Sequence, residues 1–213
     1  MKTDELIAML ANGLEPVERG ALARAFSAAL ALGLPLSTAL MIAFLGFNPS
    51  LRTYLAEPMF WTKFGFGLAL ALASLWMAAR LARPGARVSS AALLPLAPIA
   101  GLWLLAAPVL VSAAPAERAA LMWGETWRTC ITWIPLLSAP VLVGALLALR
   151  KMAPTRPALA GAAAGALAGG AGAAIYALHC PELAAPFLAI WYVIGASIPT
   201  LAGALIGRRA LRW

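Results

Sequence analysis

The sequence contains very little charge. Only 11% of its 213 residues are Asp, Glu, Lys or Arg, whereas 63% are hydrophobic. A soluble domain of this size needs far more charge to cover its surface, so this composition excludes an ordinary soluble protein. The fold class that it favours is an all-α polytopic membrane protein, because apolar runs of about 20 residues cross a bilayer as helices.

Groups that carry catalysis are also scarce. The chain has one histidine and no His-Glu-x-x-His motif, phosphate-binding loop or Cys-x-x-Cys pair. These absences argue against an enzyme, including a quinone-linked thiol oxidase, which would need paired cysteines. No Asp or Glu falls within the predicted helices, although proton-coupled and ion-coupled transport usually needs such groups. A small membrane transporter or channel therefore stays only as the alternative function.

Six transmembrane helices form the predicted bundle, separated by clusters of Pro, Gly and charged residues. They cover about residues 22–46, 59–80, 91–113, 129–149, 158–178 and 187–207. The chain then divides into a cytoplasmic N-terminal segment (1–21), a transmembrane domain (22–207) and a cytoplasmic tail (208–213). Lys63 lies close enough to a helix end for its side chain to snorkel to the lipid headgroups.

The basic residues fall mostly on one side of these helices. That side receives Lys2, Arg19, Arg24, Arg80, Arg83, Arg87, Arg150, Lys151, Arg156, Arg208, Arg209 and Arg212. The other side receives only Arg52, Lys63, Arg118 and Arg128. Because cytoplasmic loops carry the excess of Lys and Arg, both termini are predicted to be cytoplasmic. Residues 47–58, 114–128 and 179–186 then lie outside.

Glycines recur at four-residue spacing in the last two predicted helices. Gly161, Gly165 and Gly169 share one helix face, as do Gly203 and Gly207. Such faces let another helix approach closely. We predict that both are packing surfaces within the bundle, with a homodimer contact as the alternative.

The two cysteines, Cys130 and Cys180, fall at helix ends on the predicted outer side, and His179 is next to Cys180. Thiols facing an oxidising compartment can form a disulfide. Thiols and imidazole also suit soft metals such as copper, so all three side chains are candidate ligands for a transient metal ion, without a resident cofactor. Alternatively, both cysteines are small buried hydrophobic residues. Sequence alone does not give the distance between them.

A short amphipathic helix is predicted at the N-terminus. Polar residues suited to a helix start precede an apolar stripe. Membrane-surface helices are usually rich in Lys and Arg, whereas this one is acidic, so a protein partner fits better than lipid. The candidate contact residues are Thr3, Asp4, Glu5, Leu6, Ile7 and Leu10.

Three segments of the chain resemble the NrsF family. They are the opening Met-Lys-Thr-Asp-x-Leu-Ile, the Thr-Trp-x-x-Cys at 126–130, and the run from Ala153 through Gly195. Tyr-Ala-Leu-His-Cys-Pro-Glu, within that run, is the most specific part. The family consists of six-helix inner-membrane anti-sigma factors that act on SigF-like ECF sigma factors in proteobacteria.

The resemblance implies that the protein holds an ECF sigma factor at the bacterial inner membrane until a stress signal arrives. It also implies that Cys130 and Cys180 are needed for the response to metal or oxidative stress. The N-terminal segment would contact the sigma factor. We expect membrane lipid as a second partner and no direct binding of nucleic acid.

Overall fold

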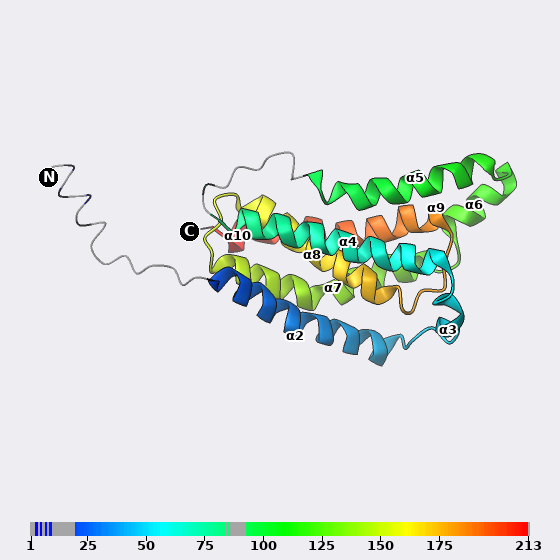
Figure 1. Ribbon diagram of the computed structural model, residues 1–213, viewed down its shortest axis with the longest axis horizontal. Helices are drawn as coiled ribbons and strands as arrows, with labels where there is room; N and C mark the ends of the chain where they lie inside the picture. Colours follow the sequence, from blue (N-terminus) through cyan, green and yellow to red (C-terminus); the bar gives the residue numbers. More distant parts are fainter. Residues whose placement is uncertain are drawn as a thin grey trace.

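A computed structural model describes residues 20–83 and 93–212, together with Thr3, Glu5, Ile7, Met9 and Gly85. Every regular element within these residues is a helix (Figure 1). The predicted all-α class is therefore confirmed for the described part of the chain.

Most of the long helices agree with the predicted ones to within a few residues. The third begins at Leu96, and residues 91 and 92 lie outside the described residues. The sixth, predicted over 187–207, corresponds to the continuous helical stretch Ala185–Ala210, of which the regular α-helix begins only at Val193. The long helices are α2 (Ala21–Phe44), α4 (Pro58–Leu81), α5 (Leu96–Ser112), α7 (Trp127–Arg150), α8 (Pro157–Tyr176) and α10 (Val193–Ala210). Two short helices, α3 (Leu51–Tyr54) and α6 (Pro115–Trp123), were not predicted. A further short helix, α9 (Ala185–Phe187), leads into the π-helical segment η2 (Leu188–Tyr192), which continues directly into α10.

Five helical stretches are long and apolar enough to cross a membrane. They are Ala21–Phe44, Pro58–Leu81, Pro115–Arg150, Pro157–Tyr176 and Ala185–Ala210. The remaining apolar helix, α5, has 17 residues. At 1.5 Å per residue, α5 is about 26 Å long, slightly shorter than the hydrocarbon core of a typical bilayer, about 30 Å thick.

Helix α8 is the centre of the bundle and packs against α4, α7 and α10. From Ala160 to Tyr176, every residue except Ala162 is buried. Its glycines allow this contact, because a methyl group on Gly161 would meet the backbone of Gly203 and Gly207. The predicted packing role of the glycine faces is therefore confirmed within a single chain.

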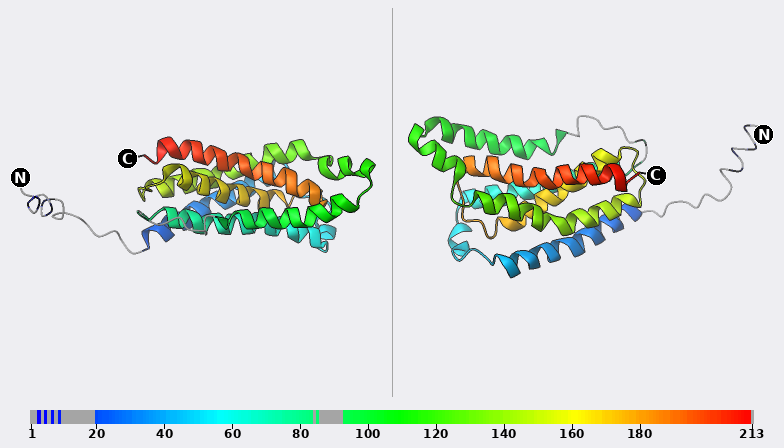
Figure 2. Two further views of the ribbon diagram at one scale, coloured as in Figure 1. Left: turned by 90° about the horizontal axis from the view of Figure 1, so that it is seen from above. Right: turned by 180° about the vertical axis from the view of Figure 1, so that it is seen from behind.

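The bundle has two chemically different ends (Figures 1 and 2). Helix α2 begins, and α10 ends, at what we call the basic end, where the last turns of α7 and α10 carry Arg150, Arg208 and Arg209. The opposite end carries α3, α6 and the connection 177–184, and we call it the cysteine end. Cys130 lies in the first turn of α7 and Cys180 in that connection, so the two cysteines share one end as predicted.

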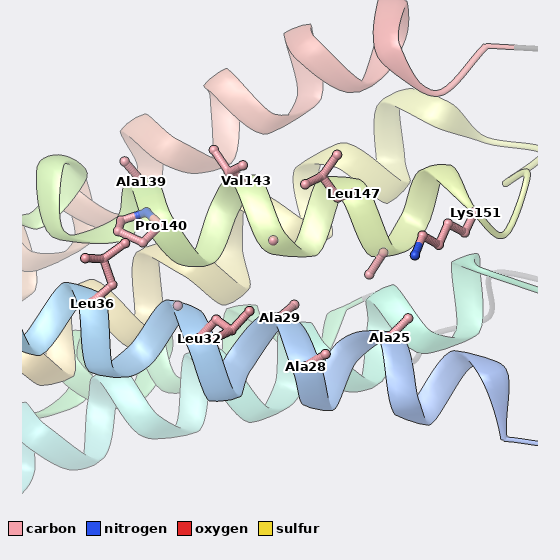
Figure 3. Close-up of a pocket in the computed structure, with 13 residues that line it drawn as sticks. Ala25, Ala28, Ala29, Leu32, Leu36, Ala139, Pro140, Val143, Leu147 and Lys151 are labelled. Carbon is pink, nitrogen blue, oxygen red and sulfur yellow. The ribbon is translucent and has the colours of Figure 1, made fainter.

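An apolar groove of about 630 Å³ runs between α2 and α7 (Figure 3). Leu32 and Leu36 line it from α2, Val143 and Leu147 line it from α7, and Lys151 lies at its basic end. The groove contains neither cysteine. The thiols are therefore packed inside the bundle, apart from this groove.

Candidate functional site: a buried thiol cluster

The packing of α7 on α8 brings the two cysteines together. The chain continues past Tyr176 as a tight turn, in which the Cys180 N–H donates to the Tyr176 carbonyl at 3.0 Å. This turn directs Cys180 toward the start of α7, which carries Cys130. Both residues are fully buried, both thiols are free, and they lie close enough to share a hydrogen bond.

Two buried tyrosines complete the lining of the cluster. The Cys130 Sγ donates a hydrogen bond to the Tyr176 hydroxyl at 3.6 Å. The ring of Tyr192 lies 6.0 Å from that of Tyr176, measured between centroids. The Tyr192 hydroxyl lies near Cys180, but within the described part of the chain it has no hydrogen-bond partner. The neighbouring Trp191 anchors η2 by donating its indole N–H to the Met122 carbonyl at 2.8 Å.

Lys63 enters the same cluster from α4. Its side chain is fully buried, and its Nζ donates to the Cys180 carbonyl at 2.5 Å and to the Glu182 carbonyl at 3.3 Å. The rings of Tyr54 and Phe60 lie 5.9 and 5.6 Å from the same nitrogen. The prediction that Lys63 snorkels to the headgroups is therefore wrong, because the carbonyls of the cysteine connection supply its hydrogen-bond acceptors inside the bundle.

A sequence signal for this position does exist. Phe60, Lys63, Gly67 and Leu70 follow one another at helical spacing, and all four are buried on one face of α4. This periodicity places Lys63 on the packed face of the helix rather than on its exposed face. For Lys63, this helical periodicity predicts burial better than the distance of the residue from the helix end predicts exposure.

Glu182 ties the cysteine connection to α7. Its Oε1 accepts hydrogen bonds from the backbone N–H of Glu125 at 2.8 Å and of Thr126 at 3.3 Å. These N–H groups precede the first turn of α7, where a negative charge is favourable. One carboxylate therefore fixes the position of Cys180 relative to the helix that carries Cys130.

His179 makes a contact outside the thiol pair. Its Nδ1 lies 3.1 Å from the Gly46 carbonyl, beyond the end of α2. The described residues contain no group of three or more His, Cys, Asp or Glu side chains that could hold a metal ion. The three candidate ligands Cys130, Cys180 and His179 thus share one end of the bundle without forming a metal-binding group in this conformation.

The environment of Cys180 favours its thiolate. The neighbouring Cys130 side chain lowers the pKa of the Cys180 thiol, and the positive charge of Lys63 lowers it further, whereas burial acts in the opposite direction. The net result is a pKa of about 6. Because the thiolate is the nucleophilic form of cysteine, Cys180 is chemically distinguished from a structural buried cysteine.

The sequence of the whole chain agrees with the family resemblance. The family model described as the negative regulator of sigma F (NrsF) matches residues 10–213. The chain belongs to the NrsF family. Because members of this family are regulators, the prediction that the protein is not an enzyme is confirmed.

Two relatives in the NrsF family align with the entire chain. The probable anti-sigma-F factor NrsF of Azospira oryzae is 45% identical over 213 residues, and the alignment covers all of both proteins. The anti-sigma-F factor NrsF of Caulobacter vibrioides is 37% identical over 222 aligned positions, again with complete coverage of both. No solved structure matches the chain.

The predicted partner-binding segment is described only in part. Thr3, Glu5 and Ile7 are helical and exposed. Asp4, Leu6 and Leu10 lie outside the described residues. The contact that this segment would make with a sigma factor stays a prediction.

Proposed function

We propose that the chain is a membrane-bound anti-sigma factor that holds an ECF sigma factor and releases it when Cys130 and Cys180 are oxidised. The observation that carries the anti-sigma role is the full-length similarity to two proteins described as anti-sigma-F factors. The restriction to ECF sigma factors rests on the resemblance of the cysteine-containing segments to NrsF.

The helices support a location in the bacterial inner membrane, with both termini in the cytoplasm. Five helical stretches are apolar and long enough to cross it, and α5 would cross as a sixth by local thinning of the bilayer. The basic end would face the cytoplasm, by the positive-inside rule, and the cysteine end would face the periplasm. The groove between α2 and α7 suits a lipid chain, because its lining is almost entirely apolar.

The thiol cluster supports a redox signal. Disulfides form in the periplasm and are rare in the cytoplasm, so a free thiol pair at the periplasmic end would report on oxidation there. A soft metal such as copper, bound transiently by both thiols, would be the other signal.

Release of the sigma factor requires a signal to cross the bundle. The N-terminal segment precedes α2 in the sequence, and α2 begins at the basic end, whereas the thiols lie at the cysteine end. A tenfold loss of sigma-factor affinity requires only about 1.4 kcal/mol of coupling between the two sites. Lys63 and Glu182 make hydrogen bonds that connect helices at the cluster. Rearrangement of these bonds could supply this energy.

Co-purification from the native membrane tests the function. The tagged chain, with and without residues 2–14, is isolated before and after exposure of the cells to peroxide, and its partners are identified by mass spectrometry. We expect a sigma factor with the intact, unexposed chain, and much less after peroxide or after the deletion. Absence of any sigma factor from every preparation would refute the anti-sigma role.

Two single variants test the signal in the same assay. Cys130→Ser and Cys180→Ser should keep the sigma factor bound after peroxide, because neither can form the disulfide. A Ser112→Ala variant, which changes an exposed hydroxyl at the end of α5, serves as the matched control and should release normally. Normal release by both cysteine variants would refute thiol sensing while leaving the anti-sigma role intact.

A further inference from the structure

The two buried thiols have different neighbours. The Cys130 thiol donates to the Tyr176 hydroxyl on α8. Lys63 on α4 donates to the Cys180 carbonyl, and the Tyr192 hydroxyl of η2 lies near Cys180. Glu182 is the nearby carboxylate, and its side chain is held by the backbone at the start of α7. The groups that could stabilise a negative charge therefore gather around Cys180.

Lys63 has an unusual set of partners for a buried amine. In the described part of the chain, its hydrogen bonds go to two main-chain carbonyls and to no carboxylate. A buried positive charge is costly unless an opposite charge lies near it. The sulfur of Cys180, whose own carbonyl accepts one of these bonds, can provide that opposite charge.

Tyr192 carries a hydroxyl group that is not hydrogen-bonded within the described residues. Its hydroxyl is fully buried and lacks a partner among the described residues. Such a hydroxyl is uncommon, because buried polar groups are nearly always hydrogen-bonded. An oxygen atom added to the Cys180 sulfur would provide an acceptor for this hydroxyl.

We propose that Cys180 is the thiol that a peroxide-class oxidant attacks, that Cys130 then converts the product into a disulfide, and that Lys63 and Tyr192 are positioning residues for the first step. This inference rests on the proposed redox signal and assigns the order of its chemistry.

The two steps balance with hydrogen peroxide as the oxidant. The Cys180 sulfur attacks one peroxide oxygen, so that an S–O bond forms and the O–O bond breaks. Sulfur loses two electrons, and the departing hydroxide takes up the proton released by the Cys180 thiol. The Cys130 sulfur then attacks the Cys180 sulfenic acid. An S–S bond forms, the S–O bond breaks, and the second hydroxide leaves as water with the Cys130 proton.

Burial restricts the oxidant to small molecules. Cys180 has no exposed surface, but the next residue, Pro181, is exposed at the end of the bundle. Only local opening of this connection is needed to admit a molecule the size of hydrogen peroxide. Bulky reagents should react far more slowly with the folded protein.

Trapping of the sulfenic acid tests the order of attack. Cys130→Ser and Cys180→Ser variants, purified in lipid nanodiscs, are treated with hydrogen peroxide in the presence of dimedone, and labelled residues are quantified by mass spectrometry. We expect Cys180 in the first variant to be labelled at least about tenfold faster than Cys130 in the second. Equal rates, or faster labelling of Cys130, would overturn the proposal.

Two further variants in the Cys130→Ser background test the positioning residues. Lys63→Met and Tyr192→Phe should each slow the labelling of Cys180, Lys63→Met by about tenfold or more. The matched control is Arg128→Met, which removes an exposed cation near Cys130. This control should keep the rate of the parent.

A structural defect is distinguished from loss of positioning in two ways. In dodecyl sulfate, which removes the packed environment, all variants should label Cys180 at one common rate. If Lys63→Met does not fold, the labelling rate of Tyr192→Phe decides between positioning and a structural defect. This variant should fold, because the hydroxyl that it removes has no hydrogen-bond partner among the described residues. Unchanged Cys180 labelling in folded Tyr192→Phe and Lys63→Met would overturn their assigned roles.

These assays need no sigma factor, so the two proposals fail separately. Labelling of Cys180 first, without sigma release by peroxide, would refute the proposed signal alone. Sigma release with Cys130 labelled first would refute the order of attack alone.

Discussion

A single methyl group on α4 should have opposite effects at two glycines that lie half a turn apart. An added Cβ at Gly67 would lie 2.6 Å from the Ala174 nitrogen and 2.8 Å from the Gly170 oxygen, both in the backbone of α8. At Gly65, no heavy atom lies within 4 Å of the added Cβ. We therefore compare Gly67→Ala with Gly65→Ala as a matched pair.

The expected magnitudes follow from packing and helix propensity. Replacing a mid-helix glycine by alanine stabilises a helix by about 0.5–1 kcal/mol. At Gly65 this gain stands alone. At Gly67 the backbone of α8 cannot rotate away as a side chain can, so overpacking costs about 1–3 kcal/mol. Gly67→Ala should therefore be less stable than Gly65→Ala by at least about 1 kcal/mol.

The assay is unfolding of the purified variants in mixed micelles by increasing dodecyl sulfate, followed by circular dichroism. A second readout comes from the thiol cluster, because Lys63 lies one turn before Gly67 on the same buried face. Displacement of α4 from α8 should move Lys63 away from Cys180 and slow peroxide labelling in Gly67→Ala only. Equal stability of the two variants would refute the close packing of α4 on α8.

Three other predictions concern the cluster itself. Tyr192→Phe should keep or raise the free energy of unfolding, since an unsatisfied buried hydroxyl costs about 1–3 kcal/mol, whereas Tyr176→Phe should lower it. A melting comparison in which Tyr192→Phe is the less stable variant would contradict this. Glu182→Gln should loosen the connection and speed Cys180 modification by methyl methanethiosulfonate; an unchanged rate would show that its bonds to α7 are dispensable. The pKa of Cys180 lies below its ordinary value, so its reaction with that reagent should persist as the pH falls below about 8.5 and decline only near pH 6. The stabilisation from its thiolate is likewise present above the unfolded pKa and lost as the pH falls through the folded one. A rate that declines already near pH 8.5 would contradict the lowering of this pKa by Cys130 and Lys63.

Much of the bundle could be predicted because long apolar runs follow simple rules. Apolar runs must be helical where water is absent, so the long helices follow from hydropathy. The location of Cys130 and Cys180 at one end then follows from counting helices. Glycine spacing predicts the contact of α8 with α10, because only small residues permit such close approach.

The interior of the site could not be predicted to the same depth. Tyr176 and Tyr192 belong to different helices, and their meeting depends on how α8 and η2 rotate about their axes. Hydropathy does not report that rotation when a helix is apolar on all sides. Glu182 acts through backbone N–H groups at the start of α7, which leave no trace in residue identity.

The positions of the internal prolines indicate how a change at the cluster would travel. Internal prolines occur in α2, α5, α7 and α10, and helices bend at such residues. Helices α4 and α8 contain no proline after their first turns. Oxidation would remove the negative charge beside Lys63 and leave a buried cation with two carbonyls. A shift of Lys63 toward other polar groups would lower the free-energy cost of this buried cation. Since α4 is stiff and carries Lys63 near one end, we expect such a shift to move the whole helix.

Spin labels attached by non-thiol chemistry test that expectation. Leu72 on α4 and Leu201 on α10 are both exposed, at 57% and 65%, so labels there should not disturb packing. Their separation should change on peroxide treatment, whereas that between Leu201 and the exposed Leu147 on α7 should change less. Lys63→Met should abolish the first change, because the charge that drives it is gone. A separation that stays constant in the parent while the disulfide forms would exclude α4 as the route from the thiols to the basic end.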